Sequence, residues 1–228
     1  MSGYLKRYVM PAFWPVNRKG NKWVSRPRTG PHKIEQCISL QILVRDSFSL
    51  TDNVPETKKL IKSGAILVDK RKRTDIKYPV GFMDVIEIPS VKKYYRVMLS
   101  SKGLHPEEIK ETDSSRKLCI VKGKKAIKGG KFQLSLHDGR NVIVLPKNDY
   151  KVNDSVIISL PEQKIAKHFK FEKGAASFIT AGKNIGITGT IEEIKERKTM
   201  LEKAMVTIKT KDNKSLLVPK KYVMVGEV

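Results

Sequence analysis

The stretch Lys58-Lys59-Leu60-Ile61-Lys62-Ser63-Gly64-Ala65-Ile66-Leu67-Val68-Asp69 contains the end of a predicted helix and the start of a predicted strand. Leu60 and Ile61 supply an inward apolar face, whereas the lysines lie on the opposite, exposed face. Gly64 follows the last helical turn, where glycine readily adopts the left-handed conformation that ends a helix. The apolar run 65–68 then predicts a short strand. These residues therefore predict a helix, a turn and a strand with a basic outer surface.

The flanking residues extend this unit to residues 39–89. Upstream, the apolar side chains of 40–50 recur at mostly helical offsets, which predicts a first short helix. Thr51 and Asn53 can cap the second helix, and Pro55 suits its first turn. Downstream, residues 69–73 (Asp-Lys-Arg-Lys-Arg) form a cationic turn, and 85–88 predict a returning strand. The segment is therefore predicted to be helix, helix, strand, basic turn, strand.

Residues 1–38 form a segment of a different kind. No Asp or Glu occurs from Met1 to Lys33, and the prolines and glycines in this stretch disfavour regular helix or strand. A flexible basic tail is one interpretation. Trp14 and Trp23 argue against it, because aromatic rings beside cations suit a segment that becomes ordered when it wraps RNA. We expect an extended basic arm, with the tryptophans stacked on bases or anchored on the protein.

The remaining residues are rich in β-strand patterns. Short apolar runs separated by Gly, Asn and Asp turns predict a small central β-barrel or sandwich at 90–172 and a second β-barrel at 173–228. The predicted fold class is thus α+β, mostly β, with four segments in series: the arm (1–38), the helical RNA-binding unit (39–89), the central β-domain and the C-terminal β-barrel.

The charge of the chain indicates its partner. Lys and Arg total 46 against 23 Asp and Glu, a formal net charge of +23. Such an excess predicts a polyanionic partner. A membrane is disfavoured because no apolar run approaches the roughly 18 residues that span a bilayer. We expect RNA instead.

Chemistry-bearing residues are sparse. The two cysteines and four histidines, Cys37, Cys119, His32, His105, His137 and His168, show no metal-ligand spacing, so we expect no metal and no disulfide. Ser135, His137 and Asp138 are the residue types of a catalytic triad, but we interpret them as a polar turn, since triads assemble from distant segments. No phosphate-binding glycine motif is present, so we expect no cofactor, no small-molecule substrate and no enzymatic activity.

Two local patterns resemble known RNA-binding motifs. Val44-Arg45-Asp46, the stretch 58–69 and Gly81-Phe82-Met83-Asp84-Val85-Ile86 together resemble the alpha-L motif, which binds structured RNA and also occurs in RNA-modifying enzymes. The string 178–191 (Phe-Ile-Thr-Ala-Gly-Lys-Asn-Ile-Gly-Ile-Thr-Gly-Thr-Ile) resembles a KOW motif. Once the arm and both motifs are set aside, too little chain remains for a catalytic domain that we can identify.

The order of these segments, with Leu5-Lys6-Arg7, 29–33 (Thr-Gly-Pro-His-Lys), 137–140 (His-Asp-Gly-Arg) and 182–186 (Gly-Lys-Asn-Ile-Gly), resembles the S4e family of small-subunit ribosomal proteins of archaea and eukaryotes. The resemblance implies a cytoplasmic structural protein of the small ribosomal subunit, of archaeal type. Its partners would be small-subunit ribosomal RNA and neighbouring ribosomal proteins, with no self-association. Two alternatives remain: a transient ribosome-assembly factor built from the same parts and, ranked below it, an RNA-modifying enzyme with an alpha-L domain.

The expected RNA contacts are basic, amide or aromatic side chains in each segment. They are, in the arm, Lys6, Arg7, Trp14, Arg18, Lys19, Lys22, Trp23, Arg26, Arg28, His32 and Lys33; in the helical unit, Arg45, Lys58, Lys59, Lys62, Lys70, Arg71, Lys72 and Arg73; and in the β-rich part, Arg140, Lys183, Asn184, Arg197 and Lys198. Most would meet phosphates, so that binding depends on salt and on RNA shape more than on base identity.

Overall fold

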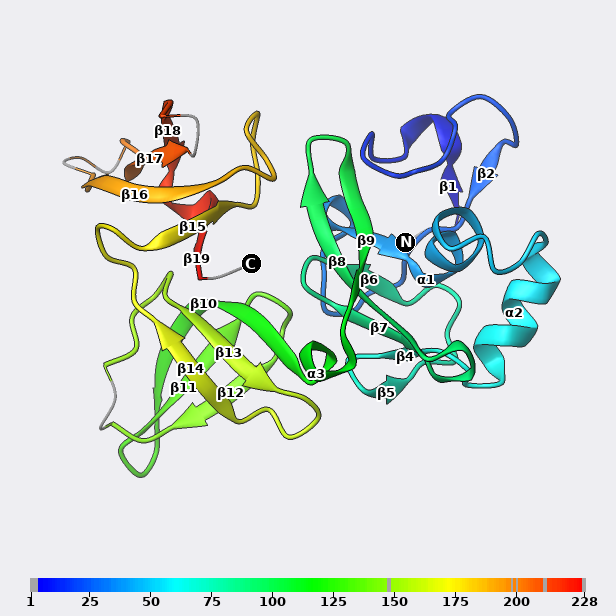
Figure 1. Ribbon diagram of the computed structural model, residues 1–228, viewed down its shortest axis with the longest axis horizontal. Helices are drawn as coiled ribbons and strands as arrows, with labels where there is room; N and C mark the ends of the chain where they lie inside the picture. Colours follow the sequence, from blue (N-terminus) through cyan, green and yellow to red (C-terminus); the bar gives the residue numbers. More distant parts are fainter. Residues whose placement is uncertain (1–3, 147–148, 198, 200, 211–212, 227–228) are drawn as a thin grey trace. The chain divides into compact units, whose positions relative to one another are not determined.

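A computed structural model describes residues 4–146, 149–197, 199, 201–210 and 213–226. The chain divides into two compact units: Met1–Lys117 with Leu160–Glu162, and Leu118–Ser159 with Gln163–Val228 (Figure 1). The mostly β fold class predicted from the sequence is confirmed. The division into four segments stays a prediction.

The first unit is built on an antiparallel five-stranded sheet in the order β5-β4-β7-β8-β9. Its strands are β4 (Leu67–Val68), β5 (Arg71–Lys72), β7 (Val85–Ile88), β8 (Lys93–Ser100) and β9 (Gly103–Ile109). The pair β3 (Cys37–Ser39) and β6 (Pro79–Gly81) forms a second, two-stranded sheet. Ile38, Ile61, Ile66, Val80 and Ile86 are fully buried, so the core of this unit joins both sheets to the helices.

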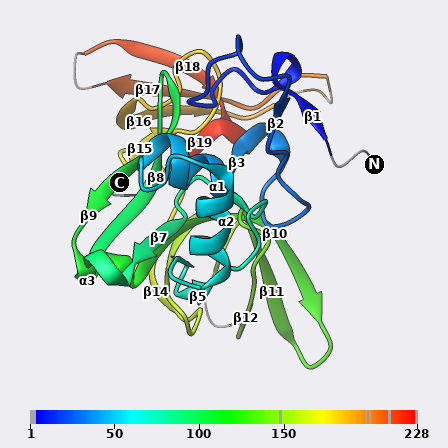
Figure 2. The same ribbon diagram turned by 90° about the vertical axis from the view of Figure 1, so that its right-hand side faces the viewer.

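Helical turns cover one side of this core, as Figure 2 shows for α1 and α2. The first predicted helix is α1 (Leu40–Ile42), which continues as the π-helical turn η3 (Leu43–Ser47); the second is α2 (Val54–Lys62). Gly64 has φ +74° just after α2, as the turn requires. Short helical segments complete the unit: η1 (Arg7–Val9), η2 (Ile34–Gln36), η4 (Pro89–Val91) and α3 (Glu111–Ser114).

Thr51 and Asn53, the predicted caps of α2, lie at the start of the helix but do not cap it through the Asn53 side chain. Asn53 occupies the N-cap position, but its side chain makes no capping hydrogen bond. Thr57 instead donates its hydroxyl to the Asn53 carbonyl at 2.8 Å, and its oxygen lies 2.7 Å from that of Thr51. A buried threonine one turn into the helix therefore ties down the preceding loop.

The N-terminal segment folds back on itself. Its two short strands, β1 (Leu5–Lys6) and β2 (Trp23–Val24), pair in antiparallel fashion. Met10 and Trp14 are each only 3% exposed, and the Trp14 indole N–H donates to the Cys37 carbonyl at 2.9 Å. These few apolar side chains hold a segment that has little regular structure of its own.

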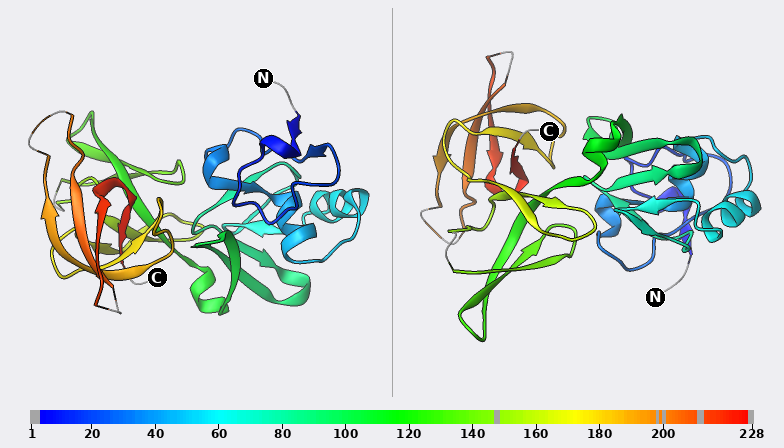
Figure 3. Two further views of the ribbon diagram at one scale, coloured as in Figure 1. Left: turned by 90° about the horizontal axis from the view of Figure 1, so that it is seen from above. Right: turned by 60° about the horizontal axis from the view of Figure 1, so that its bottom comes forward.

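The second unit contains two antiparallel five-stranded sheets (Figure 3). The first has the order β12-β11-β10-β13-β14, with β10 (Arg116–Ile127), β11 (Lys131–Leu136), β12 (Asn141–Val144), β13 (Ser155–Ser159) and β14 (Ile165–Phe169). The second has the order β18-β17-β16-β15-β19, with β15 (Ala176–Ile179), β16 (Thr188–Lys195), β17 (Met205–Thr210), β18 (Ser215–Pro219) and β19 (Val223–Val225); the short helix η5 (Lys220–Tyr222) precedes β19. The second sheet closes on its own core of aliphatic side chains, among them Ile179, Ile191, Val206, Ile208 and Val218.

Candidate nucleic-acid interface

A buried cluster of charged side chains fixes the first unit. The Lys117 ammonium, fully buried, lies 2.7 Å from Asp69 Oδ2 and 2.6 Å from Asp84 Oδ1. The Asp84 carboxylate also lies 3.0 Å from His32 Nε2 and accepts the Gly81 N–H at 2.9 Å. Asp69 accepts the Val85 N–H at 3.0 Å. The cluster therefore joins the basic turn, strands β6 and β7, the first residues of β10 and the end of the N-terminal segment.

The electrostatics of Asp84 show how strongly the cluster is coupled. Burial alone would raise the pKa of this carboxyl group. Attraction to Lys117 and His32 and the hydrogen bonds from both outweigh burial, so the pKa of Asp84 lies well below its usual range. Asp84 is thus a carboxylate held charged inside the protein, and its partners are needed to keep it there.

The predicted basic surface of the helical unit lies on the C-terminal half of α2 and on β5. Lys58, Lys59 and Lys62 are exposed, as are Arg71 and Lys72. A Cβ atom placed on Gly64 would lie 3.5 Å from Lys72 Cδ, so the Lys72 side chain runs past the end of α2. The Lys72 side chain and the end of α2 therefore lie side by side, and the RNA contacts of these residues stay a prediction.

Three other predicted cations of this unit have partners within the protein. Lys70 pairs with Glu87 at 2.8 Å, and Arg45 pairs with the adjacent Asp46 at 2.9 Å. The Arg73 guanidinium lies 4.3 Å from the centroid of the Tyr78 ring. These side chains hold the surface in shape and have less freedom to meet a phosphate than the α2 lysines.

In the N-terminal segment the structure separates two roles that the sequence could not. Trp14 and His32 are among the predicted RNA contacts, and both side chains are buried. Trp14 packs against the Cys37 carbonyl, which is the anchoring on the protein that the sequence left open, and His32 lies against Asp84. Their contact with RNA stays a prediction. Trp23 is 48% exposed, with Lys22 over its ring and Tyr4 beside it. Trp23 is therefore the tryptophan available for stacking.

The cations of this segment are mostly exposed. Arg28 reaches Asp75 at 3.3 Å and donates its backbone N–H to the Lys77 carbonyl, which ties the segment to the loop after the basic turn. Arg7 and Arg26 are half-buried. The other predicted contacts are exposed and appear in no ion pair within the described residues: Lys6, Arg18, Lys19, Lys22 and Lys33.

The predicted contacts of the second unit are scattered. Arg140 pairs with the buried Asp138 at 3.1 Å, so it supports the turn before β12. Lys183 is exposed and Asn184 half-buried in the turn between β15 and β16, whereas Arg197 is exposed beyond the end of β16. Lys198 lies outside the described residues.

Sequence analysis missed one basic feature of this unit, the hairpin of β10 and β11, whose tip extends from the sheet (Figures 2 and 3). No acidic residue occurs from Arg116 to His137, which was a readable signal. Burial and the positive charge of Lys221 both lower the pKa of Lys122, so two lysines of this unit repel each other. The other lysines of the hairpin are exposed: Lys124, Lys125, Lys128 and Lys131.

The residues considered as a triad make unrelated contacts. The Ser135 hydroxyl donates to Asn141 Oδ1 at 2.8 Å, and His137 Nδ1 accepts the Ile120 N–H at 3.3 Å. The ligand atoms of Cys119, His137 and Asp138 lie within 4.8 Å of one another, a proximity that sequence spacing did not show. A cation there would compete with the Arg140 guanidinium, which is already bound to Asp138.

In the part of the chain that is described, every helix is too short or too polar to span a bilayer.

Comparisons with known proteins agree with this arrangement. The sequence model of Ribosomal family S4e matches residues 91–165, that of the RS4NT domain residues 2–35, and that of the S4 domain residues 52–86. The chain is 42% identical over 225 residues to the small ribosomal subunit protein eS4 of Methanothermobacter thermautotrophicus, covering 97% of this chain and 91% of that protein. It is 44% identical over 200 residues to the protein of the same name from Ignicoccus hospitalis, covering 84% and 78%.

A solved structure shares the fold. The crystal structure of the 30S ribosomal protein S4e from Thermoplasma acidophilum has a TM-score of 0.72 and 31% sequence identity, and the match covers 83% of this chain and 94% of that one. The sequence identity extends over nearly the whole chain and the fold agrees with it. The chain belongs to the ribosomal family S4e.

Proposed function

We propose that this protein is a non-catalytic constituent of the small ribosomal subunit in the cytoplasm. It binds small-subunit ribosomal RNA through phosphate and shape contacts, supports the folded form of that RNA in translation, and meets neighbouring ribosomal proteins. The names of its relatives support this function, as does the match to the S4 domain.

One structural observation carries the proposal: the two parts of the basic surface are held in place, α2 by packing and β5 by the buried ion cluster that includes Asp69. Lys58, Lys59 and Lys62 extend from a helix whose position is set by packing. Because strand β5, which bears Arg71 and Lys72, begins two residues after Asp69, the Lys117 cluster positions this strand as well. A fixed array of cations can contact several phosphates of folded RNA at once, and each neutralised phosphate releases counterions.

The first test is sedimentation of native cell extract at moderate and high salt. We expect this protein in stoichiometric amounts in mature small subunits, resisting the salt wash. Confinement to precursor particles would point to an assembly factor instead, and confinement to free protein would refute the proposal.

The second test addresses the RNA surface. The triple variant Lys58→Gln, Lys59→Gln, Lys62→Gln should bind a small-subunit RNA fragment more weakly, with a shallower dependence of log K on log salt, by up to about 0.9 per lost phosphate contact. The matched control changes three exposed lysines elsewhere in the unit, Lys93, Lys102 and Lys110, to Gln. Equal slopes for the two variants would show that net charge alone, and not this surface, governs binding.

A further inference from the structure

The first sheet of the second unit is open. In its order, β12-β11-β10-β13-β14, the end strands are β12 and β14, and no described strand pairs with the outer edge of either. An unpaired edge presents backbone N–H and C=O groups that another strand can bind. The two edges border the same groove, as the residues that line it show.

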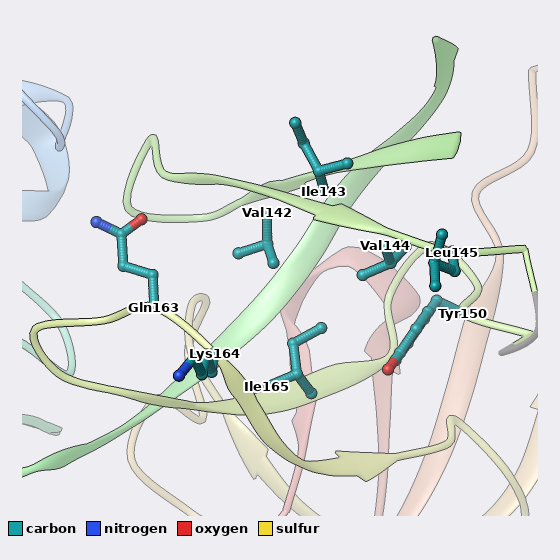
Figure 4. A pocket seen from close by; sticks show the side chains of 8 residues that line it. All are labelled: Val142, Ile143, Val144, Leu145, Tyr150, Gln163, Lys164 and Ile165. Carbon is teal, nitrogen blue, oxygen red and sulfur yellow. The ribbon is translucent and has the colours of Figure 1, made fainter. Parts of the chain in front are cut away.

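This groove, of about 450 Å³, is lined by Val142, Ile143, Val144, Leu145, Tyr150, Gln163, Lys164 and Ile165. Figure 4 shows that Val142 and Val144 of β12 and Ile165 of β14 point into the space between the strands. On the rim, Ile143 is 63% exposed and Leu145 59% exposed. Apolar side chains flanking an unpaired edge are a costly surface to leave in water, and such surfaces mark sites of interaction.

The geometry points to an extended protein segment as the occupant. RNA lacks the alternating N–H and C=O groups that an open strand edge needs, and its phosphates gain nothing from an aliphatic lining. A second copy of this chain is disfavoured, because each copy has a formal charge of +23 and self-repulsion opposes close approach.

Charge adds a requirement on that segment. Lys164 lies at one end of the groove, beside Gln163 (Figure 4). In register, Lys124 pairs with Leu134 and Leu134 with Val142, which places Lys124 on the same face of the sheet as Val142. None of the lining residues is acidic. An incoming segment therefore gains from a carboxylate at this end.

We propose that the groove between β12 and β14 binds an extended segment of a neighbouring protein by strand addition. The segment has apolar side chains at alternate positions, which face Val142, Val144 and Ile165, and an acidic residue beside Lys164. Its paired part is about four to six residues long, the usual length of a strand. The proposal rests on the proposed function in that the neighbour is a protein of the small ribosomal subunit.

The test is photo-crosslinking in purified, salt-washed small subunits, with p-benzoylphenylalanine in place of Leu145. The matched control carries it in place of Leu217, which is 57% exposed on β18 in the other sheet. We expect the Leu145 probe, and not the control, to crosslink to one protein at one segment with alternating apolar residues and an acidic residue. Adding Lys164→Glu should lower the yield several-fold, whereas Lys167→Glu on the same strand should not.

Other outcomes overturn the proposal. Crosslinks to ribosomal RNA, to a second copy of this chain or to many unrelated segments would refute strand addition, as would no crosslink from subunits that contain the probe-bearing protein. Sedimentation of the same samples distinguishes failure of the strand-addition proposal from failure of the proposed function. If the protein is present in subunits but gives no crosslink from position 145, strand addition is refuted and the proposed function is not. If the protein is absent from subunits, both proposals are refuted.

Discussion

Replacing Lys117 with methionine should destabilise the first unit by about 3–5 kcal/mol, the usual cost of removing one partner from a buried ion pair. The ammonium is fully buried, and two carboxylates, those of Asp69 and Asp84, depend on it. Methionine has nearly the same length, so packing changes little while both charges lose their cation. The loss should therefore fall in the upper part of the range.

The assay is urea unfolding followed by tryptophan fluorescence. Both tryptophans, Trp14 and Trp23, lie in the first unit, and Trp14 is only 3% exposed, so the signal reports on this unit. The control is Lys93→Met, an exposed lysine of the same unit that should change stability by less than about 0.5 kcal/mol. A loss below about 1 kcal/mol for Lys117→Met would refute the reasoning. Adding Asp69→Asn should recover part of the loss, because one uncompensated carboxylate is removed.

The pH dependence provides an independent check with a defined sign. In the native protein the folded-state pKa of Asp84 is depressed, so its stabilising contribution is complete above the unfolded value of about 3.9 and is lost as pH falls through the folded pKa. Without Lys117, burial raises that pKa, and of the two residues that lower it only His32 remains. The buried carboxylate then destabilises the variant at neutral pH, and protonation relieves it. The difference in stability between native protein and variant should therefore narrow as pH is lowered from 7 toward about 4.

Three further predictions concern residues around this cluster. Trp14→Phe leaves the Cys37 carbonyl without its donor and should cost about 1–3 kcal/mol in urea unfolding followed by circular dichroism; an unchanged midpoint would contradict the burial of this contact. Gly81→Ala should cost about 1–3 kcal/mol in the same assay, because its Cβ would lie 2.5 Å from His32 Cγ, and full stability would show that the ring can move freely. Burial, with a smaller contribution from Asp84, raises the pKa of the Cys37 thiol to about 12, so Cys37 should resist Ellman's reagent at pH 8 until urea unfolds the protein; rapid reaction of the native protein would refute this.

The sequence predicted those elements that local patterns determine. The helix ending at Lys62, the turn at Gly64 and the strand that follows are found where the stretch 58–69 places them. Most of the predicted short strands are also present, because alternation and glycine turns mark them directly. The exposed lysines of α2 could be identified for the same reason, since their side of the helix follows from its period.

Residues whose role depends on distant partners could not be predicted. Nothing near Lys117 marks it as buried, because its acidic partners lie 48 and 33 positions earlier in the chain. The role of His32 could not be predicted for the same reason, since its partner Asp84 is 52 positions away. Trp14 is ambiguous for a further reason: an aromatic ring among cations suits both a base and a protein core. The open edges of β12 and β14 are equally hidden, because a sequence pattern shows that a strand exists but not whether it is paired.

The lysines of the first unit fall into two groups: those paired with carboxylates and those exposed to solvent without an ion pair. Lys117 and Lys70 are paired with carboxylates inside the first unit, where they stabilise the chain against the self-repulsion that a net charge of +23 imposes. Lys58, Lys59 and Lys62 have no ion pair among the described residues and face solvent. A phosphate adds little to a paired cation but removes repulsion among unpaired ones. Binding of RNA therefore favours the unpaired population, whose lysines extend from a helix that packing holds in place before RNA arrives.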